Sequence, residues 1–171
     1  MTVPVEDLFA HYHESLVRML YRRTGDRDRA EEIAQEVFAR AVAAPPRNPR
    51  PWLFAVALNL LREEARTAAR QERRLVLYRA EHSDRATPPS PEDELDRSER
   101  VARVRGALDE LTPRDREALL LKAEGFNYDE IAATLGLARG AIGTTLARAR
   151  RRLVEAYRAG GGNEEKQHVA S

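Results

Sequence analysis

A chain of 171 residues is long enough for one ordinary domain or two small ones. It contains no cysteine, which excludes disulfides, thiolate metal sites and thiol chemistry, and its net charge of +1 indicates no strongly charged partner by itself. No apolar run approaches the roughly 18 residues of a membrane span, and the N-terminus lacks a signal-peptide pattern, so we expect a cytoplasmic protein with no membrane insertion.

The first 78 residues carry three periodicities typical of amphipathic helices. Residues 6–23 form the first predicted helix, with an apolar face of Leu8, Phe9, Tyr12, Leu16 and Leu20. Residues 28–44 form the second, with Ala30, Ile33, Ala34, Val37, Phe38, Ala41 and Val42 inward. Four prolines predict a stiff loop over 45–51, followed by a third helix from Trp52 to about Tyr78. The apolar run 52–61 also fits a buried strand, but its helix-forming continuation favours a helix.

Residues 79–95 are acidic and rich in proline, which predicts a flexible, extended linker. Its charge is opposite to that of the flanking blocks, which would let it lie along a positive channel of a partner. A helix is then expected from about Glu94 to Glu110, with Val101, Val104, Ala107, Leu108 and Leu111 as its core face. Thr112 and Pro113 are suited to start the next helix, which runs to Ala123.

Residues 127–153 have the pattern of a helix-turn-helix. Asn127 and Glu130 fit a capping box, and Gly136 fits the left-handed turn between two helices. The second helix repeats apolar side chains on one face at Ile142, Leu146, Ala149 and Leu153. The opposite arc consists of Gly140, Ala141, Thr144, Ala147, Arg148 and Arg151.

That second helix is the most cationic part of the chain. From residue 139 to 152 there are five arginines and no acid: Arg139, Arg148, Arg150, Arg151 and Arg152. An ordinary helical hairpin with a solvated basic face is the alternative, but such helices normally alternate the sign of their charges. The pattern favours DNA binding, with Thr144 and Arg148 at base edges or phosphates and Arg151 at a phosphate.

The chain shows no strand pattern and no internal repeat, so we predict an all-α fold. Two small helical domains, residues 1–78 and 96–158, would be joined by the linker 79–95. Three glycines near the end predict a disordered tail over 159–171.

This layout resembles bacterial RNA polymerase sigma factors of the extracytoplasmic-function (ECF) type over nearly all of residues 5–157. The family has a promoter-melting region two, a flexible linker and a helix-turn-helix region four. The helix 28–42 looks like the family's polymerase-docking helix, which implies that Glu31, Glu32, Gln35 and Glu36 bind the polymerase. A solvated acidic helix face is the alternative for those four residues.

The stretch Pro51-Trp52-Leu53 with Val56-Ala57-Leu58-Asn59 is similar to the segment with which the family opens the upstream promoter element. The resemblance implies that Trp52 and Asn59 hold a flipped base, while Arg62 and Arg66 track single-strand phosphates. For Trp52, packing in the core is the alternative. Two departures from the family are Leu58 in place of an arginine in this segment, and Gly143-Thr144-Thr145 in place of basic residues around a serine in the recognition helix. The second departure would weaken the distal-element contacts or shift them toward Arg139, Arg148 and Arg151.

The resemblance therefore implies a sigma factor that binds RNA polymerase core and directs promoter recognition and DNA-templated transcription initiation. Its expected partners are polymerase core, promoter DNA and an anti-sigma factor, with no small-molecule substrate. A helix-turn-helix regulator that binds DNA without polymerase is the alternative. An enzyme built on Glu31, Glu32, Glu63 and Glu64 is disfavoured, because no histidine, cysteine or Gly-rich loop is near them. The four histidines are scattered, so neither a metal nor another cofactor is expected.

Overall fold

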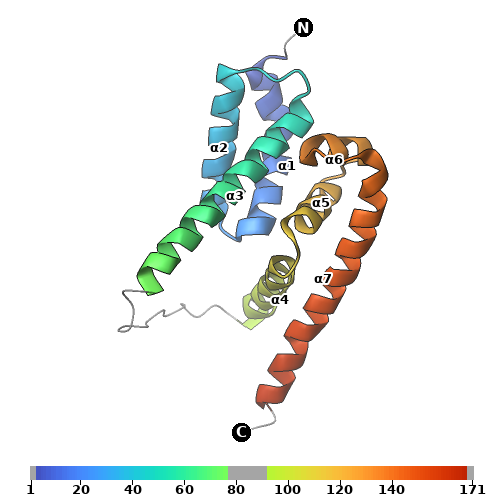
Figure 1. The fold of residues 1–171 in the computed structure, drawn as a ribbon. Coiled ribbons are helices and arrows are strands. Elements are labelled where there is room, and N and C mark those ends of the chain that lie inside the picture. The colour runs from blue at the N-terminus through green and yellow to red at the C-terminus, as the bar shows by residue number, and fades with distance from the viewer. Residues whose placement is uncertain (1–2, 77–91, 169–171) are drawn as a thin grey trace.

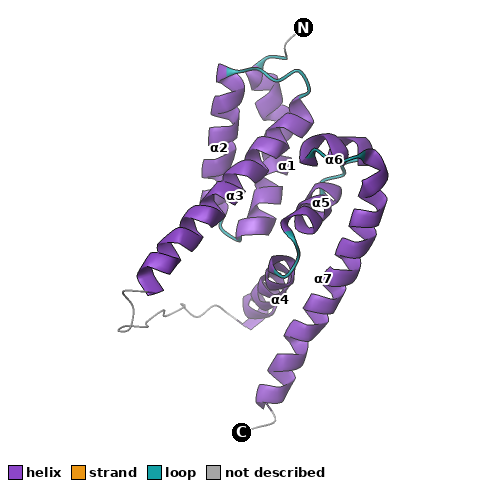
Figure 2. Ribbon diagram, in the orientation of Figure 1, coloured by secondary structure: helices purple, strands orange, loops and turns teal. Residues whose placement is uncertain are grey.

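The computed structural model describes residues 3–76 and 92–168, and these form helices joined by turns, without a strand among them (Figures 1 and 2). The all-α prediction is confirmed for this part of the chain. The helices are α1 (Val5–Thr24), α2 (Arg27–Ala43), α3 (Pro49–Val76), α4 (Glu92–Asp109), α5 (Pro113–Ala123), α6 (Tyr128–Leu135) and α7 (Arg139–His168). Most of the predicted linker, residues 79–91, lies outside the described residues, and 92–95 begin α4.

Helices α1, α2 and α3 pack together as one bundle (Figure 1). Gly25, with a φ of 66°, ends α1, and the Asp26 side chain accepts a hydrogen bond from the Arg29 backbone N–H at 3.0 Å to begin α2. Apolar side chains cover the inner faces of the three helices, and Leu16, Leu20, Val37 and Leu53 are fully buried there.

Three details of this bundle differ from the sequence-based expectation. Phe9 and Val42 were assigned to the core but are exposed, and the Phe9 ring stacks on His13 instead. Helix α3 begins at Pro49 rather than Trp52. Proline is tolerated in the first turn of a helix, where the backbone N–H has no partner, so both Pro49 and Pro51 fit there.

Helices α4 to α7 form the second half, in which α7 packs along α4 and α5. The Thr112 side chain caps α5, as its sequence position indicated. The capping box is confirmed: the Asn127 side chain accepts from the Glu130 N–H at 2.9 Å, and the Glu130 side chain accepts from the Asn127 N–H at 2.8 Å. Gly136 turns the chain toward α7 with a φ of 65°.

Two expectations for this half are wrong. Val101 and Val104 are exposed on α4, whereas Ala107, Leu108 and Leu111 are buried as expected. The chain also continues as helix through the three glycines to His168, where a disordered tail from 159 was predicted. Arg103 of α4 accounts for part of this, because its guanidinium donates to the Tyr157 carbonyl at 3.1 Å and occupies the space that a Cβ of Gly161 would need.

The two halves also pack against each other, α3 beside α6 and α1 beside α5 (Figure 1). The Phe54 and Phe126 rings, both fully buried, meet edge to face with centroids 4.7 Å apart. The buried apolar residues of both halves form one continuous cluster. The sequence pattern predicted two tethered modules and gave no sign of this contact.

Candidate nucleic-acid and protein interfaces

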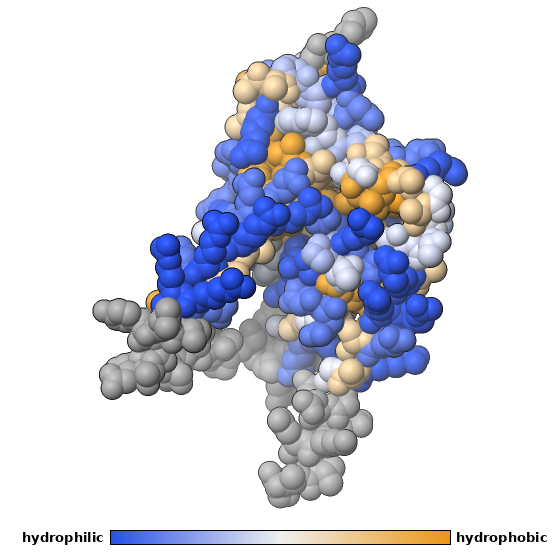
Figure 3. Space-filling model, in the orientation of Figure 1, coloured by the Kyte–Doolittle hydropathy of each residue, from blue (hydrophilic) through white to orange (hydrophobic). Residues whose placement is uncertain are grey.

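The face of α7 that turns away from the core is the one expected from the sequence. Ile142, Leu146 and Ala149 are fully buried. The opposite arc is open to solvent at Gly140, Ala141, Thr144, Ala147 and Arg151, and Arg148 is half-buried. Helix α7 therefore presents a face of small residues, a threonine and two arginines, and an α-helix is narrow enough to enter the major groove of DNA. Hydrophilic residues also dominate the surface over α3 and α7 in Figure 3.

The arginines of α7 differ in their partners. Arg148 donates to the fully buried carboxylate of Asp115 from Nη2 at 2.5 Å and from Nε at 3.1 Å, and Arg152 donates to the same carboxylate at 3.2 Å. These hydrogen bonds, above all those from Arg148, hold the pKa of Asp115 below its usual range although burial acts in the opposite direction. Arg139 pairs with the exposed Asp129 at 2.7 Å.

Arg150 and Arg151 are exposed, and neither has an ion-pair partner among the described side chains, those of residues 3–75 and 97–161. Thr144 is exposed beside them, whereas Thr145 is buried. A Cβ at Gly143 would lie 3.6 Å from the Tyr128 ring of α6, which is an ordinary van der Waals contact, so the position has room for an alanine. The distal-element prediction thus rests chiefly on Arg139, Thr144 and Arg151, with Arg148 oriented by Asp115.

The predicted melting-element residues all lie on α3: Trp52, Asn59, Arg62 and Arg66. Trp52 is half-buried and packs against the core cluster. Asn59 follows an apolar stretch of the helix, but its side chain is exposed. Its side-chain carbonyl accepts from Arg62 Nη1 at 2.8 Å. Arg66, one turn further, is exposed.

Arg62 is also held from the other half of the molecule. Its Nε donates to Glu117 of α5 at 2.6 Å, and its Nη2 pairs with the second oxygen of the same carboxylate. The hydrogen bond to Glu117 and the negative charge of that carboxylate raise the pKa of Arg62. The sequence pattern gave no sign that Glu117 is buried, because an acid beside arginines on a helix is usually solvated.

The predicted polymerase-docking residues lie on α2. Gln35 and Glu36 are exposed, and Glu36 accepts from Arg40 one turn later at 2.8 Å. Glu32 is exposed and pairs with Arg29. Glu31 is half-buried, and its Oε2 lies within hydrogen-bond distance, 2.9 Å, of His13 Nε2. The four side chains thus form an acidic and amide surface on one helix, in which Glu32, Gln35 and Glu36 are exposed and Glu31 is half-buried.

No group of three or more histidine, aspartate or glutamate side chains among the described residues is placed to hold a metal ion. None of the described helices is long and apolar enough to cross a membrane.

Two family models match the chain: Sigma-70 region 2 over residues 8–71, and Sigma-70 region 4 over residues 102–153. EcfG, an ECF RNA polymerase sigma factor of Rhodopseudomonas palustris (strain TIE-1), is 36% identical over 136 residues, covering 76% of this chain and 72% of EcfG. CarQ, an RNA polymerase sigma factor of Myxococcus xanthus, is 35% identical over 143 residues, covering 80% of this chain and 79% of CarQ.

The chain belongs to the ECF sigma factors. A further relative, ECF sigma factor SigE of Mycolicibacterium smegmatis (strain ATCC 700084 / mc(2)155), is 32% identical over 156 residues, which are 86% of this chain but 59% of SigE. This sigma factor is therefore an RNA polymerase-binding, promoter-recognition factor and not an enzyme. The alternative of a regulator that acts without polymerase is not favoured.

Solved structures of sigma factors share the fold. The sigma factor RpoE of Bartonella quintana, solved with the anti-sigma factor NepR, has a TM-score of 0.64 and 26% identity, covering 90% of this chain and 96% of RpoE. CnrH, solved with the cytosolic domain of CnrY, has a TM-score of 0.65 and 27% identity, covering 91% of this chain and 88% of CnrH.

Proposed function

We propose that this sigma factor divides promoter recognition among three helix surfaces. Region two, residues 1–78, docks on polymerase core through α2 and holds melted promoter bases on α3. Region four, residues 96–158, reads the distal promoter element through α7. The observation that carries this assignment is that Gln35 and Glu36 on α2, Asn59 and Arg66 on α3, and Thr144 and Arg151 on α7 are all exposed.

For α2, charge and exposure support a protein partner. Glu31, Glu32, Gln35 and Glu36 place carboxylates and an amide on the side of the helix away from Ile33 and Val37, which are buried. Carboxylates in this arrangement form charge-assisted hydrogen bonds with arginines of a partner. The docking surface on polymerase core would be correspondingly basic.

For α3, the order of the residues supports contact with single-stranded DNA. Trp52 and Asn59 offer an aromatic surface and an amide for an unstacked base, and Arg62 and Arg66 follow for the phosphates on either side of it. The half-buried position of Trp52 leaves one part of the ring in the core and another part available. Binding energy, rather than side-chain chemistry, would then keep the duplex open.

For α7, Arg139, Thr144, Arg148 and Arg151 would lie in the major groove of the distal element. Asp115 fixes Arg148 through Nε and Nη2, which leaves Nη1 to donate to DNA. The expected partners are polymerase core, promoter DNA and an anti-sigma factor, as RpoE and CnrH have in their solved complexes. Because polymerase acts on the chromosome, the protein would work in the cytoplasm.

Gel-shift experiments with and without polymerase core test this proposal. The purified chain alone should barely shift a duplex promoter fragment at physiological salt, and addition of core should produce a specific, heparin-resistant complex. A tight, sequence-specific shift by the chain alone, unchanged by core, would instead favour the polymerase-independent regulator.

A further inference from the structure

Glu31 differs from the other three docking residues of α2 in its contacts. Among the described residues, it alone of the four bonds to a side chain of another helix: its Oε2 lies 2.9 Å from Nε2 of His13, on α1. An ionised carboxylate only accepts hydrogen bonds, so the imidazole donates this one from Nε2. The His13 and Glu31 side chains are 26% and 32% exposed, which places the bond at the edge of the contact between α1 and α2.

The ring that donates this bond is held by aromatic neighbours. Phe9, one turn earlier on α1, stacks on the His13 ring with centroids 4.3 Å apart and planes 25° apart. Phe38 of α2 packs on Phe9, with centroids 5.0 Å apart, and its ring centroid is 6.2 Å from that of His13. These contacts restrict rotation of the imidazole. Nε2 of His13 therefore stays directed at Glu31.

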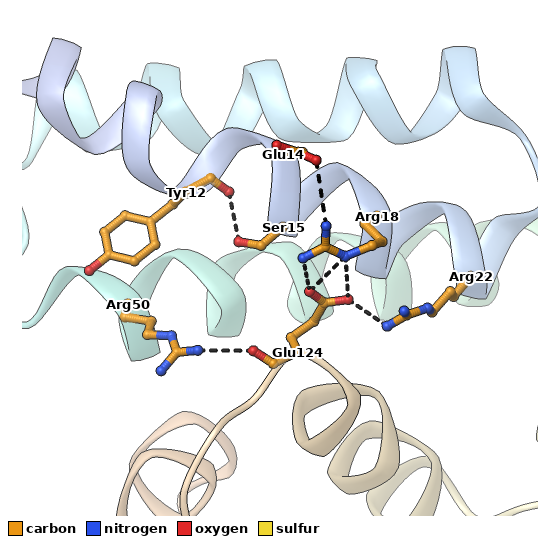
Figure 4. Close-up of polar contacts among 7 residues, drawn as sticks. All are labelled: Tyr12, Glu14, Ser15, Arg18, Arg22, Arg50 and Glu124. Carbon is orange, nitrogen blue, oxygen red and sulfur yellow. Dashed lines mark hydrogen bonds and ion pairs between the residues drawn. The ribbon is translucent and has the colours of Figure 1, made fainter.

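The arginines near Glu31 do not compete with His13 for its carboxylate. Arg18 of α1 and Arg27 of α2 line the same pocket as Glu31, which has a volume of about 460 Å³. The Arg18 guanidinium points to the carboxylate of Glu124, to which it donates at 2.8 and 3.1 Å (Figure 4). Arg27 precedes Glu31 by one turn, but no ion pair joins the two.

One oxygen of Glu31 is therefore fixed and the other is open. Its Oε1 has no hydrogen-bond partner among the described residues, and the pocket beside it leaves room for a basic side chain of another protein. Gln35, one turn later on the same face of α2, is exposed. A glutamate that is already ordered loses less conformational freedom on binding than a freely rotating one. The hydrogen bond from α1 thus prepares Glu31 for a partner.

We propose that His13 is a positioning residue for polymerase docking, because its imidazole holds Glu31 in the orientation in which Oε1 accepts from a basic side chain of polymerase core. This inference rests on the proposed docking role of Glu31. His13 acts through Glu31 and requires no contact of its own with the polymerase. The docking face of α2 is then functionally continuous with α1.

The direct test compares three replacements of His13 by fluorescence anisotropy of the labelled, full-length chain with polymerase core. His13→Phe keeps a ring against Phe9 but removes the donor, so affinity for core should fall about threefold to tenfold, as for the loss of one hydrogen bond. His13→Gln removes the ring but can place an amide N–H near the position of Nε2, so it should recover most of the affinity. His13→Asn carries the same amide one methylene shorter and should bind as weakly as His13→Phe.

The opposite order of affinities would overturn the proposal. If His13→Phe bound core like the unmodified chain and His13→Gln did not, ring packing rather than the hydrogen bond would be what matters. Circular dichroism checks that each variant keeps its helix content. Should His13→Phe fail to fold, the comparison of Gln with Asn decides, because these two differ only in the reach of the donor.

His11→Phe is the matched control. It makes the same change two positions away on α1, at an exposed histidine whose ring meets Tyr12 with centroids 4.6 Å apart. Its affinity for core should equal that of the unmodified chain. An equal loss in His11→Phe and His13→Phe would contradict a role through Glu31.

A double-mutant cycle separates this inference from the function on which it rests. In a Glu31→Ala background, His13→Phe should cause no further loss of core affinity, because the group that it positions is absent. An undiminished loss in that background would show that His13 acts by another route. If Glu31→Ala weakens core binding but His13→Phe does not, the inference fails alone. If Glu31→Ala leaves core affinity unchanged, the docking role of Glu31 fails and the inference fails with it.

Discussion

The carboxylate of Asp115, fully buried at the start of α5, accepts hydrogen bonds from Nε and Nη2 of Arg148, 33 residues later in the recognition helix α7. This side-on pairing fixes both the position of the guanidinium and the rotation of α7 about its axis. The same carboxylate holds Arg152 one turn further along. Asp115 therefore fixes how two arginines of α7, Arg148 and Arg152, are oriented.

Removal of this carboxylate should destabilise region four. Asp115→Asn is expected to lower the free energy of unfolding by about 1–3 kcal/mol, because charge-assisted hydrogen bonds of a buried group are replaced by weaker ones. Urea denaturation followed by circular dichroism measures the change. Asp129→Asn, which alters an exposed carboxylate paired with Arg139, is the control and should cost less than about 0.5 kcal/mol. Equal losses in the two variants would contradict the assigned role.

The same pair predicts a pH dependence. The pKa of Asp115 is lowered in the folded chain, so its contribution to stability is complete above the unfolded value of about 3.9 and is lost as pH falls through the lower folded value. The difference in unfolding free energy between the unmodified chain and Asp115→Asn should thus be constant from pH 7 to about pH 5 and shrink in more acidic solution. A difference that grows on acidification would have the wrong sign.

Arg151 should contribute a phosphate contact to the distal element. Arg151→Ala is expected to weaken holoenzyme binding to promoter duplex and to reduce the slope of log affinity against log salt by about 0.9. Arg148→Ala should reduce that slope by less, because Asp115 already offsets its charge. Arg158→Ala, an exposed arginine two turns beyond, is the control. If Arg158→Ala reduces the salt slope as much as Arg151→Ala does, the phosphate contact cannot be assigned to Arg151.

Gln35 and Glu36 should be required for polymerase binding. The double variant Gln35→Ala/Glu36→Ala is expected to lose about tenfold to 100-fold in affinity for core while keeping its helix content, because both side chains are exposed. Fluorescence anisotropy of labelled chain with core measures this. The chain offers a matched control in Gln71→Ala/Glu72→Ala, an identical adjacent pair that is exposed on α3. Comparable losses in both would mean that α2 is not the docking helix.

Asn59 should act after docking, in promoter opening. Asn59→Ala is expected to leave core affinity unchanged and to reduce open complexes about tenfold, as expected for loss of hydrogen bonds to an unstacked base. Permanganate reactivity of promoter thymines reports the open state. Thr67→Ala, two turns along α3, is the control. Normal opening by Asn59→Ala would remove Asn59 from the proposed site.

Local patterns predicted most of the helices and the exposed face of α7. The Asn127–Glu130 capping box, Gly136 and the spacing of Ile142, Leu146 and Ala149 depend on neighbours within a few turns, so the sequence shows them directly. The start of α3 was misplaced because prolines such as Pro49 and Pro51 suit both a loop and a first helical turn. The glycines of α7 stay helical through packing against α4, which local propensity does not contain.

The sequence pattern did not predict which carboxylates are buried. Glu124 binds an arginine 106 positions away, and Glu117 binds one 55 positions away. In a chain where acids and arginines alternate on helices, each of these residues has the signature of a solvated side chain. Their burial follows from contact between the two regions, and no short-range pattern encodes that contact. Burial likewise distinguishes two arginines that look alike in the sequence: Arg148 is half-buried and bound by Asp115, whereas Arg151 is exposed.

Run-off transcription with purified chain, bacterial polymerase core and a library of genomic templates tests the central claim most directly. The account predicts discrete transcripts that start at defined promoters, require this chain and disappear with the Gln35→Ala/Glu36→Ala variant. Transcription no different from that of core alone, on every template that contains upstream sequence, would contradict it.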